Sequence, residues 1–279
     1  MIEVQSLTFR YEGSERDALR DVNLTVPDGA FLGIIGPAGA GKTTLLHCMS
    51  GIIPHAFPGD FYGAVRVGGL DTADNRLTDL SRLVGTVFQD VDSQIISSVV
   101  EDEILYGLEN FGVPHEEIGD RLTAALEQVG ISSLRERTIA SLSGGQRQKV
   151  AIASLVALRP QILVLDEPTG ELDPFSSRQI FTLLRTLNRE HGMTVVVVEQ
   201  KIMLLSEFAD RLAVLNDGEI VKEGPVRGVL SDIPLLERIG VNCPRAALFS
   251  SLLAEKTGAE VPVCVSAEEA VEAARRVMG

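Results

Sequence analysis

The stretch that decides the fold runs from Phe31 to Thr44 and reads FLGIIGPAGAGKTT. Its apolar beginning is typical of a buried strand, and residues 41–50 read as a helix that ends at Gly51. Between them, GPAGAGKT fits the pattern GxxxxGK[ST] in the strand–loop–helix setting that this pattern requires. The stretch therefore predicts a loop that binds phosphate groups, although a plain glycine-rich turn at a helix start is the alternative.

The chemistry of phosphate explains these residue types and their spacing. Glycines let successive backbone N–H groups turn toward a phosphate, and the helix N-terminus adds its positive dipole. Lys42 would neutralise the β and γ phosphates of a nucleotide, and the hydroxyl of Thr43 would ligate Mg²⁺. The residues that we assign to this loop are Gly36, Pro37, Ala38, Gly39, Ala40, Gly41, Lys42, Thr43 and Thr44.

The sequence on both sides of this loop predicts two kinds of sheet. Residues 3–11, 18–26 and 31–36 read as short strands separated by turn residues, which favours an antiparallel region that leads into a buried strand. Farther along, the apolar runs at 161–167 and 194–199 each follow a helical segment, as parallel strands buried on both faces do. The predicted fold class is therefore α/β.

Changes of pattern divide the rest of the chain. From about residue 90 to 160, segments with helical period replace the strands and predict a helical subdomain, and residues 211–224 predict a β-hairpin. Strand signals fade after residue 230, so we predict a domain of residues 1–230 and a helical extension of residues 231–279. The segment SAEE at 266–269 predicts a capping box at the start of the last helix.

Composition narrows the classes of function. A net charge of −14 would repel nucleic acid and anionic lipid, so we expect no nucleic-acid partner and contact with a membrane only through proteins. No apolar run reaches the length of a membrane span, and the start of the chain lacks the features of a signal peptide, which predicts a cytosolic protein. The cysteines and histidines show no ligand-like spacing, so we expect packing roles for the cysteines and surface or loop roles for the histidines.

Two carboxylates end the apolar run at 161–167. Because a buried strand delivers its C-terminal residues to the ligand crevice of an α/β sheet, we place Asp166 and Glu167 near the phosphates. Asp166 would hold Mg²⁺ through water, and Glu167 would act as general base on the attacking water. Taken alone, such a strand end is more often the start of a solvated loop; the phosphate loop favours the catalytic interpretation.

A further motif, LSGGQRQ at residues 142–148, begins another helix. Ser143 is the candidate N-cap, and Gly144 and Gly145 would leave backbone N–H groups exposed at the positive end of the helix. These features predict a second anion site. The spacing leaves open whether the two sites act on one nucleotide or on two.

The succession of GPAGAGKTT, LSGGQRQ and a strand that ends in DEPT resembles the ATPases of the ABC family, over residues 1 to about 230. The resemblance implies a P-loop NTPase with a RecA-like core, an antiparallel β subdomain and a helical subdomain, with ATP and Mg²⁺ as cofactors. It also implies two subunits that face head to tail, with ATP between the phosphate loop of one and the LSGGQ helix of the other. The residues that would contact the partner's nucleotide are Ser143, Gly144, Gly145 and Gln146.

Other residues match elements of the same family. Tyr11 resembles the aromatic residue that stacks on adenine, with a core aromatic as the alternative. Gln89 resembles the glutamine that touches Mg²⁺ and water and reports to the membrane subunit; a polar strand end is the alternative. Residues 172–174 resemble the loop that crosses the dimer interface, although Gly170 and Glu171 depart from its usual small residues. The implied metal ligands are Thr43, Gln89 and Asp166.

One departure from the family concerns catalysis directly. After the strand at 194–199 the family usually has a histidine that contacts the γ-phosphate, and this chain has Gln200. A glutamine can donate a hydrogen bond but cannot carry a proton or a positive charge at neutral pH. We assign Gln200 to the catalytic site together with Glu167, and leave open whether it slows hydrolysis or serves adequately as a positioning group.

Residues 87–94 and 99–103, VFQDVDSQ and VVEDE, resemble the energy-coupling-factor (ECF) branch and its cobalt and nickel relatives. The closing SAEEAVEA is also similar to the C-terminal extension of that branch. The resemblance implies a second ATPase subunit, a transmembrane coupling protein and a small substrate-capturing membrane protein. Together these would import a vitamin or a transition-metal ion. The substrate-capturing protein would determine which one, because no residue of the present chain would contact the substrate.

Three rival functions use some of the same motifs. A soluble ABC ATPase of DNA repair or the ribosome is disfavoured by the single cassette, the acidic charge and the lack of sustained heptads. A P-loop kinase has no use for a second phosphate-binding helix supplied by a partner. A catalytically weak subunit that supports a more active twin is favoured only by Gln200.

Overall fold

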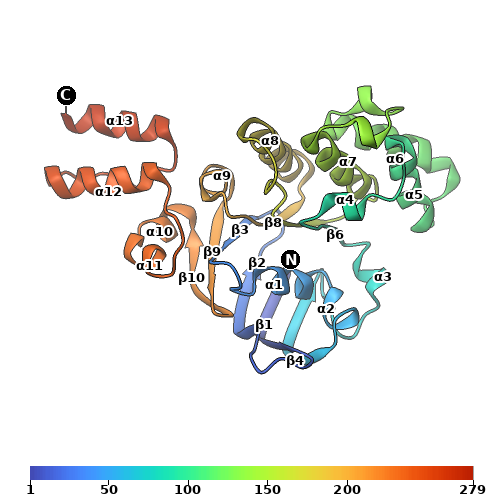
Figure 1. Cartoon of the computed structure of the whole chain (residues 1–279), viewed down its shortest axis with the longest axis horizontal. Coiled ribbons are helices and arrows are strands. Elements are labelled where there is room, and N and C mark those ends of the chain that lie inside the picture. The colour runs from blue at the N-terminus through green and yellow to red at the C-terminus, as the bar shows by residue number, and fades with distance from the viewer. Residues whose placement is uncertain (279) are drawn as a thin grey trace.

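The computed structural model describes residues 1–278, and Figure 1 shows two sheets with helices packed around them. The smaller sheet is antiparallel and has the strand order β2-β1-β4-β5. Its strands are β1 (Ile2–Tyr11), β2 (Leu19–Val26), β4 (Gly59–Val67) and β5 (Leu70–Asp71). The antiparallel region predicted at the start of the chain is therefore present.

The larger sheet has the strand order β10-β9-β3-β8-β7-β6 and is parallel except for β10. Its strands are β3 (Phe31–Ile35), β6 (Val84–Val87), β7 (Ile162–Asp166), β8 (Thr194–Val198), β9 (Arg211–Asn216) and β10 (Glu219–Pro225). Every residue of β3, β7 and β8 is buried, which is why these strands read as continuous apolar runs. The predicted parallel strands and the predicted hairpin of β9 and β10 are confirmed.

Alternate side chains of the central strands face two different cores. On β7, Ile162 and Val164 join the cluster formed with the antiparallel sheet and helix α1 (Lys42–Met49). Leu163 and Leu165 point to the opposite side, into the cluster formed with the helical part of the chain. Since successive side chains of a strand alternate between faces, the apolar run of β7 packs against both the antiparallel sheet and the helical layer. The short helices α2 (Ile52–His55) and α3 (Leu77–Leu80) lie on the same side of the molecule as the antiparallel sheet (Figure 1).

The other face of the large sheet is covered by helices, which Figure 1 shows at the top of the molecule. They are α4 (Val91–Gln94), α5 (Val100–Asn110), α6 (His115–Val129), α7 (Gly144–Ala157), α8 (Pro174–His191) and α9 (Ile202–Phe208). Helix α7 packs against both α5 and α6, so the segment between β6 and β7 forms a helical layer of its own. The predicted α/β fold class is confirmed.

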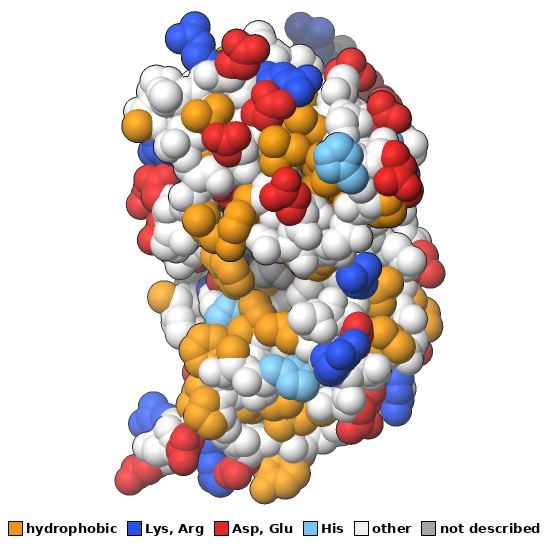
Figure 2. All heavy atoms as spheres, turned by 90° about the vertical axis from the view of Figure 1, so that its right-hand side faces the viewer, with side chains coloured by type: hydrophobic (Ala, Val, Ile, Leu, Met, Phe, Trp, Pro, Cys, Tyr) orange, Lys and Arg blue, Asp and Glu red, His pale blue; other side chains and the backbone are white. Residues whose placement is uncertain are grey.

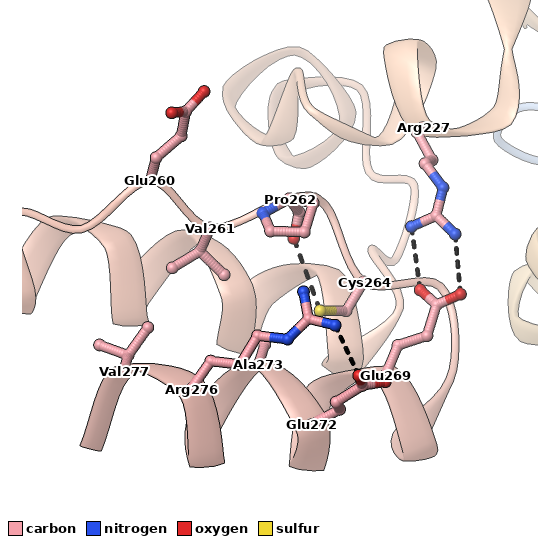
Figure 3. Close-up of a pocket in the computed structure, with 10 residues that line it drawn as sticks. All are labelled: Arg227, Glu260, Val261, Pro262, Cys264, Glu269, Glu272, Ala273, Arg276 and Val277. Atoms are coloured by element: carbon pink, nitrogen blue, oxygen red, sulfur yellow. Dashed lines mark hydrogen bonds and ion pairs between the residues drawn. The ribbon is translucent and has the colours of Figure 1, made fainter. Parts of the chain in front are cut away.

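The last part of the chain projects from the edge of the large sheet next to β9 and β10 (Figure 1). Its helices are α10 (Val226–Leu230), α11 (Ile233–Arg238), α12 (Arg245–Thr257) and α13 (Ala267–Met278). Helices α12 and α13 pack on a small apolar cluster that includes Cys264. Arg227 of α10 makes two ion-pair hydrogen bonds to Glu269 of α13, at 2.7 and 2.9 Å, and also binds the Val263 carbonyl (Figure 3). This pair ties the hairpin of α12 and α13 to the sheet domain.

The capping box predicted at 266–269 is half right. Ser266 Oγ accepts a hydrogen bond from the Glu269 N–H at 3.3 Å, as a cap does. The Glu269 carboxylate does not return to Ser266; it accepts from the Val265 N–H at 3.0 Å and pairs with Arg227. The guanidinium of Arg227, which is distant in sequence, binds the Glu269 carboxylate that a capping box would direct to the backbone of Ser266. The division of the chain at about residue 230 stays a prediction.

Within residues 1–278, the helices are all too short or too polar to cross a lipid bilayer.

Candidate active site

The phosphate loop joins β3 to α1 and is shaped by glycine. Gly41, the N-cap of α1, has a φ of +98°, and a Cβ there would lie 2.4 Å from the Ala18 carbonyl oxygen. No side chain caps α1, so its first N–H groups are left for a ligand. The loop therefore has the backbone of an anion site, built before any anion binds.

Lys42 lies folded over this loop. Its Nζ donates to the carbonyls of Gly36 at 2.9 Å and Pro37 at 2.7 Å, and the residue is only 7% exposed. Burial lowers the pKa of Lys42, and the carboxylates of Glu167 and Asp166 oppose that shift. The ammonium is thus held over the phosphate loop by bonds to neutral carbonyls, which a charged phosphate can replace.

Thr43 and Asp166 meet although they are far apart in sequence. The Thr43 hydroxyl donates to Asp166 Oδ2 at 2.6 Å. Asp166 is 6% exposed, and burial raises the pKa of its carboxyl despite that hydrogen bond. A hydroxyl, a carboxylate and the amide oxygen of Gln89 are hard oxygen donors, the kind that Mg²⁺ selects. The donor set therefore fits Mg²⁺.

The Glu167 carboxylate receives two amides. Gln200 Nε2 donates to Oε1 at 2.7 Å, and Gln89 Nε2 approaches Oε2 at 3.4 Å. The three residues come together because β8, β7 and β6 are neighbours in the sheet and each ends at the same edge. Glu167 itself has a φ of +46°, in the left-handed region that costs a non-glycine residue about 1 to 2 kcal/mol.

Tyr11 lies at the phosphate loop. Its hydroxyl is 3.1 Å from Thr44 Oγ1, and its ring packs edge-on against Phe9 and Phe57, with centroids 4.8 and 6.2 Å away. The ring is half-buried beside the core of the antiparallel sheet. The structure thus places Tyr11 both at the candidate nucleotide site and in an aromatic cluster.

The LSGGQRQ helix is α7, and the predicted cap at Ser143 is confirmed. Ser143 Oγ accepts from the Gln146 N–H at 3.4 Å, and Gln146 Oε1 accepts from the Ser143 N–H at 2.9 Å, which is a reciprocal capping box. Packing gives a second reason for glycine at the start of α7, which the sequence did not reveal. A Cβ on Gly145 would lie 3.1 Å from Ser176 Cβ, so the start of α7 needs small residues to pack on the start of α8.

A cavity of about 910 Å³ separates α7 from the ends of the central strands. Gln89, Glu167 and Gln200 line it together with Gly144 of α7, so the catalytic candidates and the LSGGQ helix border one open space. The phosphate loop is not among its lining residues within the described part of the chain. The remaining lining residues are Asp90, Val91, Asp92, Arg147, Gln148, Pro168, Gly170, Glu171, Leu172, Glu199 and Lys201.

Some functional candidates were missed from the sequence. Glu199 and Lys201 flank Gln200 and bond to the loop after β7, as described below; the polar run EQK directly after an apolar strand was the available signal. The expectation of a surface or loop role was wrong for His47, which lies in α1, stacked on Phe57 at 5.3 Å and edge-on to Phe88 at 6.2 Å. Helical spacing from Thr43 would have placed it there.

Residues 19–170 match the protein-family model described as ABC transporter. The chain belongs to the ABC transporter family. It is an ATP-hydrolysing, ATP-binding subunit of that family, and its predicted resemblance to the ECF branch is confirmed by the relatives that follow.

An ABC relative from Pyrococcus abyssi, a putative ABC transporter ATP-binding protein, is 44% identical over 244 residues, which is 88% of this chain and 87% of the relative. The energy-coupling factor transporter ATP-binding protein EcfA1 of Caldanaerobacter subterraneus subsp. tengcongensis is 36% identical over 278 residues, 98% of each chain. Both relatives are matched along nearly their whole length.

Solved ABC structures have the same fold. CbiO1 of Clostridium perfringens, part of the ABC transporter complex CbiONQ, superposes with a TM-score of 0.76 at 29% identity, over 88% of this chain and 96% of that one. The MJ0796 cassette, a dimer in a post-hydrolysis state with ADP and Pi, gives 0.70 at 31% identity, over 82% and 100%.

Proposed function

We propose that this ABC subunit hydrolyses MgATP within a dimer and powers an ECF-type importer of a vitamin or a transition-metal ion. The observation that carries the proposal is the meeting of Glu167 with the amides of Gln89 and Gln200, next to the bonded pair of Thr43 and Asp166. A base, its orienting donors and a set of oxygen ligands thus stand at one edge of the sheet, beside a loop built for phosphate.

Each residue has a distinct task in this proposal. The open N–H groups of the phosphate loop and the Lys42 ammonium bind the β and γ phosphates. Thr43, Asp166 and Gln89 would hold Mg²⁺, which, when bound, neutralises charge that develops on the phosphate oxygens. Glu167 takes the proton of the attacking water, and Gln200 orients the carboxylate through its amide. Tyr11 would stack on adenine.

The amide of Gln200 determines where the proton goes. An amide has no site that accepts a proton at neutral pH, so Glu167 is the base and Gln200 only positions. Gln89 uses its amide nitrogen toward Glu167, which leaves its carbonyl oxygen for Mg²⁺. One glutamine can therefore touch both the base and the metal.

The dimer supplies the rest of the site in this proposal. Ser143, Gly144, Gly145 and Gln146 would face the γ-phosphate of ATP bound to the partner's phosphate loop. Two lines of support are the dimeric state of the MJ0796 cassette and the absence of the phosphate loop from the described lining of the cavity that Gly144 of α7 borders. The partner would be an identical or a related ATPase subunit.

An apolar face suits a membrane component. Figure 2 shows hydrophobic side chains on both sides of the hollow between the helical layer and the antiparallel sheet. Large apolar residues on the surface include Phe57, Phe88, Ile96 and Tyr106, which are 40, 37, 66 and 46% exposed. Phe88 directly precedes Gln89, whose amide approaches Glu167, so a partner that binds Phe88 would lie beside a contact of the base.

We assign this face to a transmembrane coupling protein on the cytoplasmic side, which would work with a substrate-capturing membrane protein. CbiO1, which is part of CbiONQ, supports the assignment. Residues 1–230 would be the ATPase engine, and residues 231–279 an appended helical extension.

The first experiment measures ATP turnover and mass in solution, with and without MgATP, for the full chain and for Glu167→Gln. The variant should bind ATP and accumulate as a dimer, while turnover falls by roughly 10²- to 10³-fold because the base is lost. Glu190→Gln, which changes an exposed carboxylate of α8 outside the cavity that Glu167 lines, is the matched control and should keep turnover. Wild-type turnover in Glu167→Gln would refute the assignment of the base.

A second experiment addresses the weak-partner alternative, which Gln200 favours. Gln200→His should raise turnover if the amide limits hydrolysis, and turnover should then depend on pH near the histidine pKa of about 6.5. Unchanged turnover would show that the glutamine positions Glu167 adequately. A wild-type chain that binds ATP without turning it over would point to an obligatory second subunit or membrane partner.

A further inference from the structure

The residues on either side of Gln200 bond to the loop that follows β7. Glu199 is 2% exposed, and its carboxylate accepts from the Thr169 hydroxyl at 2.5 Å. The same carboxylate accepts the backbone N–H groups of Gln200 at 2.9 Å and Lys201 at 3.2 Å. A carboxylate this deeply buried is tolerated only when it is fully hydrogen-bonded, so its partners are held firmly in place.

Lys201 makes a second connection to the same loop. Its Nζ donates to the carbonyl of Thr169 at 2.5 Å, to the carbonyl of Leu172 at 2.9 Å and to the hydroxyl of Ser177 at 3.0 Å. Thr169 and Ser177 are fully buried. A lysine ammonium has three donors, and here all three bind residues of the loop after β7 and of the first turn of α8.

The loop is also held by the burial of Thr169 and by Leu172, which packs on the main core. Its own hydrogen bonds are local, from Gly170 N–H to Glu167 carbonyl and from Leu172 N–H to Thr169 carbonyl. It then enters α8 at Asp173, whose side chain caps that helix. A shift of the turn at 199–201 must therefore either break the bonds from Lys201 or carry the loop with it.

We propose that Glu199 and Lys201 are positioning residues that couple Gln200 to the loop of residues 169–173. Through them, the presence of a γ-phosphate at Gln200 sets the conformation of the loop that meets the partner subunit. Neither residue touches the reacting atoms. The inference rests on the proposed function and on the family resemblance, which implies a γ-phosphate contact at the position of Gln200 and a place at the dimer interface for residues 172–174.

Hydrogen–deuterium exchange tests the coupling without turnover. The full chain is diluted until its mass is that of a monomer and is given either ADP or a non-hydrolysable ATP analogue, with Mg²⁺. The analogue, but not ADP, should slow exchange in peptides that cover 199–203 and 169–173. In Lys201→Met, which keeps only the bond between Glu199 and the Thr169 hydroxyl, the slowing should persist at 199–203 and weaken at 169–173.

The outcomes separate the inference from the proposed function. Slowing of 169–173 in Lys201→Met that equals the slowing in the unmodified chain, or slowing of 199–203 alone in the unmodified chain, overturns the coupling while ATP binding stands. If direct titration shows that the chain does not bind the analogue, the proposed function is contradicted, and the coupling is contradicted with it.

Turnover provides the second measurement. Lys201→Met should lower kcat by about tenfold and change ATP affinity by less than about twofold, because the lost bonds lie outside the nucleotide contacts. Lys201→Arg keeps charge and donors and should recover much of the loss. Lys222→Met, which removes another half-buried lysine, bonded to Asp232 at 2.6 Å, should leave kcat unchanged. Equal losses in Lys201→Met and Lys222→Met would assign Lys201 a role in stability alone.

Discussion

The glycine-rich starts of α1 and α7 share a composition but differ in construction. α1 begins at Gly41 with a φ of +98° and no side-chain cap, whereas α7 begins at Ser143 with extended backbone and a reciprocal cap from Gln146. N–H groups at the first start stay open for a ligand, while at the second start the side chains of Ser143 and Gln146 already bind the N–H groups of Gln146 and Ser143. The first is a ready anion site; the second is stable without one.

The reason for glycine also differs. At Gly41 the backbone conformation and the nearby Ala18 carbonyl exclude a side chain, and at Gly145 only the packing against Ser176 is tight. One chain thus prepares a phosphate site in its backbone at Gly41 and, with similar residues at the start of α7, makes a surface that is completed elsewhere.

The largest effect is expected for Gly41→Ala. A Cβ at this φ would meet the Ala18 carbonyl oxygen, so the free energy of unfolding should fall by about 2 to 4 kcal/mol. Gly39→Ala is the control, because Gly39 has a φ of +75° with open space around it and should lose only about 1 to 2 kcal/mol. Thermal unfolding measures both, and equal losses would mean that the contact with Ala18 is unimportant.

Lys42→Met should weaken ATP binding by roughly 10- to 100-fold, since a charged donor to phosphate is lost. The nucleotide-free chain should not lose stability, because a buried ammonium whose pKa burial lowers is removed. Titration with a fluorescent nucleotide gives the affinity. Lys149→Met, whose Nζ bonds only to Gln179 at 3.2 Å within the described chain, is the matched control. Equal weakening by both variants would argue against a specific contact.

Ser143→Ala should cost about 1 kcal/mol of stability through the lost cap and leave ATP affinity of the monomer unchanged. Ser143→Asp separates the two roles of this residue. Aspartate is an equally good cap, so stability should return, but its charge would repel the partner's γ-phosphate and turnover should stay low. Full turnover in Ser143→Asp would be evidence that α7 does not approach a phosphate. Melting curves and ATPase assays are the measurements.

The smallest effect concerns Asp166. Burial raises its pKa in the folded chain above the unfolded value, so the folded chain holds the proton more tightly and loses stability as pH rises through this range. Asp166→Asn should therefore melt roughly 2 to 4 °C higher than the wild type at neutral pH. The gain should shrink toward zero in acid, and Mg²⁺-dependent ATP binding should be lost. A gain that persists unchanged in acid would contradict the burial argument.

Local sequence predicted the strands and helices well where one pattern dominated. The buried strands β3, β7 and β8 were visible because both of their faces lie in apolar cores. The capping box of α7 was partly visible because its two members are three residues apart. At 266–269 the same local reasoning failed, since the distant Arg227 took the acceptor.

The candidate site was predictable as a set of motifs and not as a geometry. Gln89, Glu167 and Gln200 were each named from neighbouring letters, but their common hydrogen bonds depend on the order of β6, β7 and β8. Glu199 and Lys201 escaped notice because their partners lie on another loop, and such pairings leave no periodic trace in sequence.

The phosphate loop, the capped helix of LSGGQRQ and the carboxylates that end β7 were predictable because each is visible as a pattern within a few positions of the sequence. Which amides reach Glu167, why Gly145 is small and how the turn at 199–201 is tied to the loop after β7 became visible only in the folded chain. Those features arise when chain ends of separate strands are brought to one edge of a sheet, and strand order is set by the packing of the whole core.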